Sequence, residues 1–139
     1  MYATVEDVRN RYGKELFALA GKTEAGDLDE AAVTRALEEA SSEIDVTLSA
    51  RYAVPVSPAP SVLRRVCVDL AVAALPRNGS SEASLYERRG REARALLQSI
   101  AAGDVSLGAD TPPAPAQGSG GGMAYSFPAS EFRQKLDEL

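Results

Sequence analysis

The sequence predicts an all-α protein: a small bundle of about four helices, followed by an extended Pro/Gly linker and a C-terminal docking helix. In four segments before residue 104, apolar residues recur every three or four positions, which is the period of a helix packed on a core. All prolines fall between or after these segments. With 139 residues, 45% of them hydrophobic, the chain can form one domain with a buried core and no disulfide.

The first helix is predicted from about Thr4 to Tyr12. Thr4 is a suitable N-cap because Asp7 follows three residues later, as in a capping box. Val8 and Tyr12 then lie on one apolar face, four residues apart. Gly13 ends the helix, since glycine accepts the backbone conformation that follows a last helical turn.

The second helix is predicted to be the longest, beginning at Asp27 or Asp29 and ending near Arg51 or Tyr52. An acidic residue suits the positive N-terminal end of a helix. The segment 54–60 contains three prolines, so it is predicted to be an extended link. The apolar positions of the helix step by three or four residues: Val33, Leu37, Ala40, Ile44 and Leu48.

The third helix, from about Ser61 to Leu75, is apolar on almost every side, which is typical of the buried centre of a bundle. The fourth is predicted to start after Ser80 or Ser81 and to end near Ala102, where Gly103 can terminate it. Its predicted inner face consists of Leu85, Tyr86, Ala93, Leu96, Leu97 and Ile100.

These patterns divide the chain into a helical domain over 1–103, a linker over 104–124 and a C-terminal arm over 125–139. The linker is rich in proline, then in glycine, and offers nothing to pack. Apolar residues return after it, which is the pattern of a tethered docking peptide. Two alternatives stay open: a tail folded back on its own domain, or an engineered linker. The arm residues predicted to dock are Tyr125, Phe127, Phe132, Leu136 and Leu139.

The composition excludes most catalytic chemistry. There is no histidine and only one cysteine, so His-based acid–base catalysis and His or four-Cys metal sites are absent. We expect no enzyme activity, no cofactor and no metal. Cys67 is interpreted as a small core residue. Asp69 interrupts the apolar third helix, so it is either buried and paired or it marks the one solvent-exposed edge of that helix. Arg65, one turn earlier, is a candidate partner.

No apolar stretch is long enough to cross a bilayer, and no signal peptide is recognisable, so we expect a cytoplasmic protein without membrane contact. Charge is unevenly spread: residues 1–59 carry a net −5, 60–102 a net +3 and 103–139 a net −3. An acidic and a basic half can pair within one subunit or between copies. The arginines of the fourth helix can instead form ion pairs along that helix or contact nucleic-acid phosphates.

Two segments resemble the Mu-like phage and prophage head–tail adaptor family. Residues 40–48 read ASSEIDVTL and residues 50–56 read ARYAVPV, followed by a helix rich in valine and alanine. The opening residues 2–4, the Arg-Tyr-Gly step at 11–13 and the segment 102–108 fit the same pattern. The resemblance covers about residues 1–108 and leaves the C-terminal arm outside it. It assigns no role to Arg64 and Arg65.

The resemblance implies a structural subunit of a tailed-phage neck, made in the bacterial host cytoplasm. Such subunits form a homo-oligomeric ring, typically twelve-fold, below the portal protein. The tail-side partner would be a neck or tail-terminator protein, and double-stranded DNA would pass through the ring without sequence-specific contacts. The alternative function is a small helical nucleic-acid-binding regulator.

Within such a ring, we expect the acidic second helix of one copy to meet a basic element of the next. The charge split between the two halves of the domain motivates this expectation. Exposed ion pairs are each worth only about 0.2–1 kcal/mol, so they would set register more than affinity. The predicted interface pairs Glu38, Glu39 and Glu43 with Arg88, Arg91 or Arg94.

Overall fold

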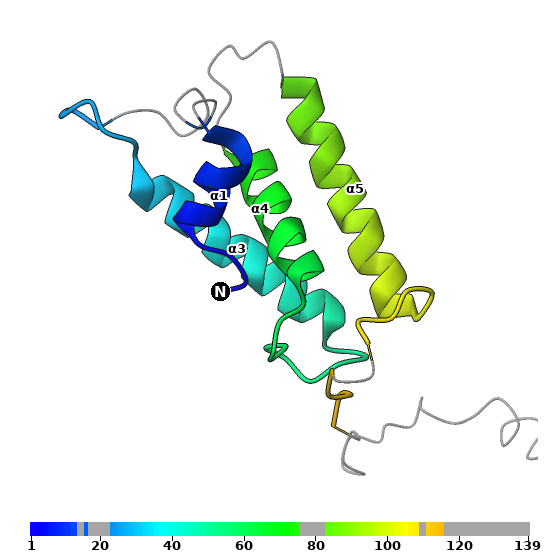
Figure 1. The fold of residues 1–139 in the computed structure, drawn as a ribbon. Helices are drawn as coiled ribbons and strands as arrows, with labels where there is room; N and C mark the ends of the chain where they lie inside the picture. Colours follow the sequence, from blue (N-terminus) through cyan, green and yellow to red (C-terminus); the bar gives the residue numbers. More distant parts are fainter. Residues whose placement is uncertain (14–15, 17–22, 76–82, 109–110, 116–139) are drawn as a thin grey trace, which may run out of the picture.

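The computed structural model describes residues 1–13, 16, 23–75, 83–108 and 111–115, and it confirms the predicted all-α fold with four packed helices. Within these residues there is no strand, only an isolated antiparallel bridge between Tyr52 and Pro113. The helices are α1 (Val5–Tyr12), α3 (Glu30–Leu48), α4 (Ser61–Ala74) and α5 (Ala83–Ala102), arranged as in Figure 1.

The helix ends follow the predicted capping residues closely. Thr4 caps α1 and forms a complete capping box with Asp7. Asp29 rather than Asp27 caps α3, because its carboxylate accepts a hydrogen bond from the backbone N–H of Ala32. Gly103 follows α5 with a φ of 90°, a conformation that glycine adopts without strain. The α3 helix ends at Leu48, a few residues earlier than predicted.

The core is built around α4, which packs on α3 along one side and on α5 along another (Figure 1). Leu63, Val66 and Leu70 of α4 are almost completely buried. The contact with α5 is close because Gly90 faces Ala73 there. A Cβ added to Gly90 would lie 2.6 Å from the Cβ of Ala73, so only glycine fits this crossing.

Hydrogen bonds hold the N-terminal segment against α3. The backbone N–H of Tyr2 donates to the Ser41 hydroxyl (3.1 Å). The Tyr2 hydroxyl donates to the Asp45 carboxylate and accepts from the backbone N–H of Val56 (2.8 Å). Cys67 is fully buried against Ser41, and burial raises the pKa of its thiol, which agrees with the predicted core role.

The first part of the predicted linker lies against the domain. The backbone N–H of Ala53 donates to the carbonyl of Pro112 (3.1 Å), and that of Ala114 donates to the carbonyl of Arg51 (3.0 Å). The N–H of Leu107 donates to the Tyr52 hydroxyl (3.1 Å). Residues 104–108 and 111–115 therefore return beside the turn that follows α3, and any free span begins no earlier than residue 116. Residues 116–124 lie outside the described part of the chain.

The contact between Gly90 and Ala73 can be tested by substitution. Gly90→Ala should lower the free energy of unfolding by about 1 kcal/mol, because overpacking costs about 1–3 kcal/mol and exceeds the helix propensity that alanine adds. Urea denaturation followed by circular dichroism measures the change. The double variant Gly90→Ala with Ala73→Gly should recover part of the loss, since it removes the opposing Cβ. Equal or greater stability of Gly90→Ala alone would contradict this packing.

The Tyr2 contacts predict a stability loss in alkali. Burial and the hydrogen bond to Asp45 raise the pKa of Tyr2 from 10.0 to about 12. Between these two values the unfolded chain loses the tyrosine proton and the folded chain keeps it. Stability from Tyr2 is therefore complete below pH 10 and falls as the pH rises to about 12, by up to about 1.4 kcal/mol per pH unit. Denaturation of the protein and of Tyr2→Phe between pH 9 and 12 should show a shallower decline in the variant; equal slopes would refute the assignment.

Candidate functional site

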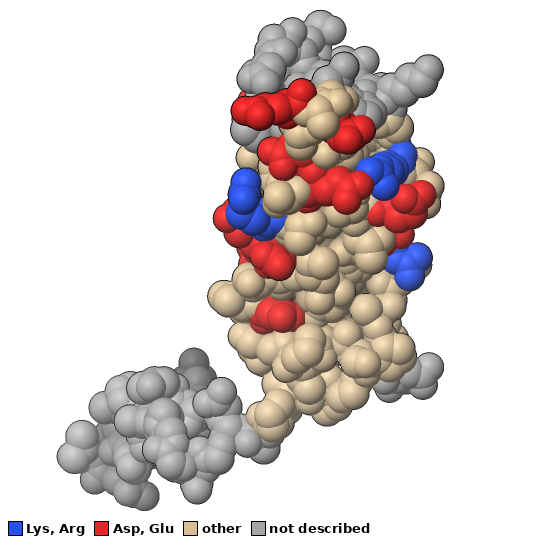
Figure 2. Space-filling model, turned by 90° about the vertical axis from the view of Figure 1, so that its left-hand side faces the viewer, with Lys and Arg blue, Asp and Glu red and all other residues tan. Residues whose placement is uncertain are grey.

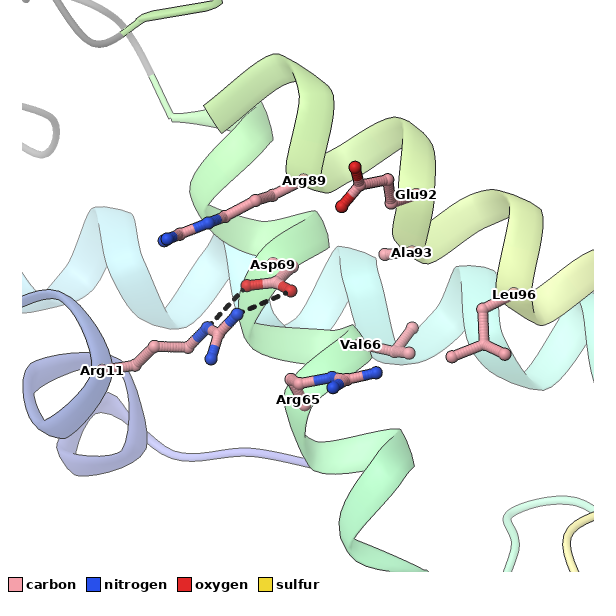
Figure 3. Close-up of a pocket in the computed structure, with 8 residues that line it drawn as sticks. All are labelled: Arg11, Arg65, Val66, Asp69, Arg89, Glu92, Ala93 and Leu96. Atoms are coloured by element: carbon pink, nitrogen blue, oxygen red, sulfur yellow. Dashed lines mark hydrogen bonds and ion pairs between the residues drawn. The ribbon is translucent and has the colours of Figure 1, made fainter. Parts of the chain in front are cut away.

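A small pocket of about 180 Å³ opens between α1, α4 and α5 (Figure 3). Each helix contributes an arginine to it, so three guanidinium groups from distant parts of the sequence come together. Two carboxylates and three apolar side chains complete its wall. The lining residues are Arg11, Arg65, Val66, Asp69, Arg89, Glu92, Ala93 and Leu96.

Asp69 holds the centre of this pocket and is 7% exposed. Its carboxylate accepts hydrogen bonds from Arg11 Nε (2.8 Å) and Nη2 (3.2 Å), and from the Tyr12 hydroxyl (2.8 Å). The pKa of Tyr12 is raised, mainly because its hydroxyl is buried. Of the two predicted alternatives, the buried and paired one is confirmed, but the partner is Arg11 rather than Arg65. Arg11 comes from the facing helix α1 and bridges both carboxylate oxygens, a geometry that a guanidinium favours.

The other two arginines of the pocket, Arg65 and Arg89, do not bind Asp69 as Arg11 does. The Arg89 guanidinium lies over the Tyr12 ring, 5.5 Å from its centroid, and Tyr12 also packs edge-to-face on Tyr86. Arg65 is exposed and has no hydrogen bond or ion pair within the described residues. The pocket therefore holds one cation without a partner among the described residues, beside a guanidinium that makes a cation–π contact with Tyr12.

A second, more open hollow of about 550 Å³ adjoins the pocket and shares Arg11 and Arg65 with it. Arg64 and the apolar side chain of Val68 also line it, together with the polar residues Asp7, Asn10 and Ser61. The two hollows form one continuous surface on α1, α4 and α5 in which arginines outnumber acidic residues. The sequence gives no spacing signal that unites Arg11 with Arg65, because they meet only in the folded bundle.

The acidic residues predicted for the subunit interface lie along α3. Glu38 and Glu39 are exposed and have no ion pair within the described residues. Glu43 is half-buried and binds Arg94 of the same chain through two hydrogen bonds, at 2.7 and 3.3 Å. This contact raises the pKa of Arg94. One predicted pair is thus formed inside a single subunit.

The basic residues predicted for the interface lie on α5. Arg88 is 3.8 Å from Glu92, one turn along the same helix, so the alternative of surface ion pairing holds for that arginine. Arg91 is exposed and unpaired among the residues that the structure describes. The pairing of Glu38 or Glu39 with an arginine of another copy stays a prediction. The arm residues Tyr125, Phe127, Phe132, Leu136 and Leu139 lie outside the described residues.

Acidic side chains gather on the side of the bundle where α1 and α3 lie. Figure 2 shows them concentrated over one end of that face, with a few arginines or lysines among them and little charge at the other end. Arg9 pairs there with both Glu6 and Glu30. The uneven charge along the sequence thus corresponds to two surfaces of the folded bundle, the acidic face and the arginine pocket.

In the described part of the chain, no group of three or more acidic or cysteine side chains is arranged to hold a metal ion. No described helix is both long and apolar enough for a membrane span. The arrangement of the pocket is suited to binding an anionic group, because Arg65 has no partner among the described residues, Arg89 adds a second positive charge, and Val66, Ala93 and Leu96 form apolar walls.

The Asp69 contacts should contribute strongly to stability. Asp69→Ala leaves the buried Tyr12 hydroxyl and the part-exposed Arg11 without their acceptor, and it should lower the free energy of unfolding by about 2–3 kcal/mol. Asp69→Asn, which keeps one acceptor oxygen, should cost less. Thermal unfolding of both variants measures the order. An unchanged midpoint for Asp69→Ala would exclude a structural role for the carboxylate.

Comparison with known proteins relates this chain to phage proteins. Residues 2–125 match the family described as Bacteriophage Mu, Gp36. The Mu-like prophage FluMu protein gp36 of Haemophilus influenzae is 37% identical over 109 residues, which are 78% of this chain and 76% of the relative. Gene product J of Escherichia phage Mu is 40% identical over 68 residues, 48% of either chain. Both the length and the identity of these matches are sufficient to assign a family, and the chain belongs to the Bacteriophage Mu Gp36 family of phage and prophage proteins.

Proposed function

We propose that the protein is a structural subunit of a tailed-phage neck, which forms a ring below the portal and joins head to tail. The observation that carries this proposal is membership in a phage Mu family by a chain whose described surface is divided into an acidic α3 side and an arginine-lined side. A head-to-tail ring needs two different complementary surfaces on each subunit. The unequal faces of this bundle meet that requirement.

The mechanism is assembly rather than chemistry. The buried helices fix the shape of the subunit, and the charged faces set the register between neighbours in a ring that we expect to be twelve-fold. The portal protein would bind on one side and a neck or tail-terminator protein on the other. The site of action would be the virion neck.

Double-stranded DNA would pass through such a ring without sequence-specific contacts. A conduit requires no contacts to base edges, and arginines that face the channel would touch phosphates alone. The net charge of −5 is consistent with weak contact.

The second candidate, a small nucleic-acid-binding regulator, draws support from the cluster of Arg11, Arg64 and Arg65. Sequence-selective binding in a gel-shift assay at physiological salt would favour it over the neck subunit.

The C-terminal arm is proposed to dock on the portal. On a predicted helix, Phe132, Leu136 and Leu139 share one face, while Pro128 makes Phe127 approach from an extended segment. About fifteen residues are marginal as an isolated helix, so these side chains need a groove on another surface. Aromatic anchors at interfaces can each contribute about 2 kcal/mol or more.

Removing the arm should separate folding from assembly. Deletion of residues 125–139, or Phe132→Ala with Leu136→Ala, should leave the thermal midpoint unchanged and abolish joining of heads to tails. Gln134→Ala, on the opposite face of the predicted helix, is the matched control and should assemble normally. Electron microscopy of particles made with each variant in place of the intact protein counts joined and separate heads. A lowered thermal midpoint would mean that the arm belongs to its own core, and normal joining would exclude portal docking.

A further inference from the structure

Two charges of opposite sign that have no partner among the described residues lie on opposite sides of the bundle. On α4, Cys67 contacts Ser41 and the Leu37 carbonyl of α3. Arg65 lies two residues from Cys67, so about 200° of helical rotation directs it away from α3. Figure 3 shows α3 behind α4, with the pocket on the nearer side.

The same reasoning places Glu39 on the outer surface of α3. It lies two residues from Leu37, which is fully buried, and two from Ser41, which is 7% exposed. Glu39 therefore projects away from α4, by the same rotation of about 200°. Within the part of the chain that the structure describes, a carboxylate without a partner thus faces outward on one side of the bundle, and a guanidinium without a partner faces outward on the other.

We propose that the arginine pocket receives the Glu39 side chain of the neighbouring copy, with Arg65 as its principal partner and Arg89 as the second cation. This contact rests on the proposed ring and specifies how its subunits are joined. The volume of about 180 Å³ accommodates one side chain, and Val66 and Leu96 offer apolar surface to its methylene groups. The carboxylate would accept paired hydrogen bonds from a guanidinium, the strongest geometry for such a pair.

A carboxylate fits this pocket better than a nucleic-acid backbone does. Asp69 and Glu92 line the pocket as well, and their negative charge opposes a polyanion more than a single side chain. Asp69 is already held by Arg11, which leaves Arg65 as the donor without a partner among the described residues, and Arg89 adds a second positive charge beside Tyr12. Of the arginines expected from the charge pattern, Arg94 already binds Glu43 and Arg88 lies near Glu92. Arg91 is exposed but lines neither hollow. The pocket combines arginines with apolar walls, and it is the basic element that we propose.

The first test exchanges the two charges in the full-length protein. Arg65→Glu or Glu39→Arg alone should reduce the joining of heads to tails by roughly tenfold or more, because each leaves like charges facing one another. The double variant should restore joining. Gln98→Glu is the control, since Gln98 is exposed on α5 and lines neither hollow, and it should assemble normally. Unchanged circular dichroism and thermal midpoints establish that each variant folds.

The second test identifies the contact directly. Arg65→Lys keeps the charge and introduces an amine that a carbodiimide can couple to a carboxylate at zero length. Assembled particles should then yield a cross-linked dimer whose joined peptides contain positions 65 and 39. Adding Glu39→Gln should abolish it, and Arg64→Lys, directed about 100° away on α4, should give much less.

The outcomes separate the contact from the ring itself. Charge-swap rescue together with the 65–39 cross-link supports the proposal. Normal joining by both single variants, an unrescued double variant without the cross-link, or an equal defect in Gln98→Glu overturns the pocket contact and leaves the neck function standing. Loss of DNA binding by Arg65→Glu in a gel-shift assay, without the cross-link, identifies phosphate as the ligand and also overturns it. Normal joining of heads and tails when the whole protein is omitted refutes the neck function instead.

Discussion

Burial of α4 is the constraint on which the rest of the structure depends. A helix that is apolar on nearly every side must be covered by other elements, and α3 and α5 cover two of its sides. The approach of α5 is possible because Gly90 has no side chain where Ala73 faces it. On the side that remains, α4 presents Asp69, whose burial requires Arg11 and Tyr12 of α1 as partners. The arginine pocket is a product of that requirement.

The helices could be predicted from sequence because their signals are local. The apolar spacing from Val33 to Leu48, the capping box at Thr4 and the glycine after Ala102 each depend on neighbours within a few residues. The partner of Asp69 could not be predicted in this way. Arg65, one turn before it, is the choice that helical spacing favours, whereas Arg11 is 58 positions away in sequence and reaches Asp69 only through the packing of α1.

For the charged residues too, the sequence predicts their positions along the helices, but their partners depend on how the helices pack. Net charge per segment indicates that one half of the domain is acidic and the other basic, and the structure adds which charges are already used. The Glu43–Arg94 pair closes α3 onto α5 within one subunit, so it contributes to the bundle. Glu39 and Arg65 have no such partner among the described residues. Spacing along a helix places a charge on a face, but only packing decides whether that charge is neutralised.

The backbone pairing between residues 51–53 and 112–114 has a consequence for the tail of the chain. It fixes the departure point of the tail beside the turn that follows α3, at one end of the bundle (Figure 1). The nine residues from 116 to 124 can extend over at most about 30 Å, whereas a tether starting at residue 104 could extend over about 70 Å. A shorter tether confines the segment that it carries to a smaller volume and raises the effective concentration of that segment at nearby surfaces. For the proposed docking arm, the pairing would limit the partners within reach to those near that end of the bundle.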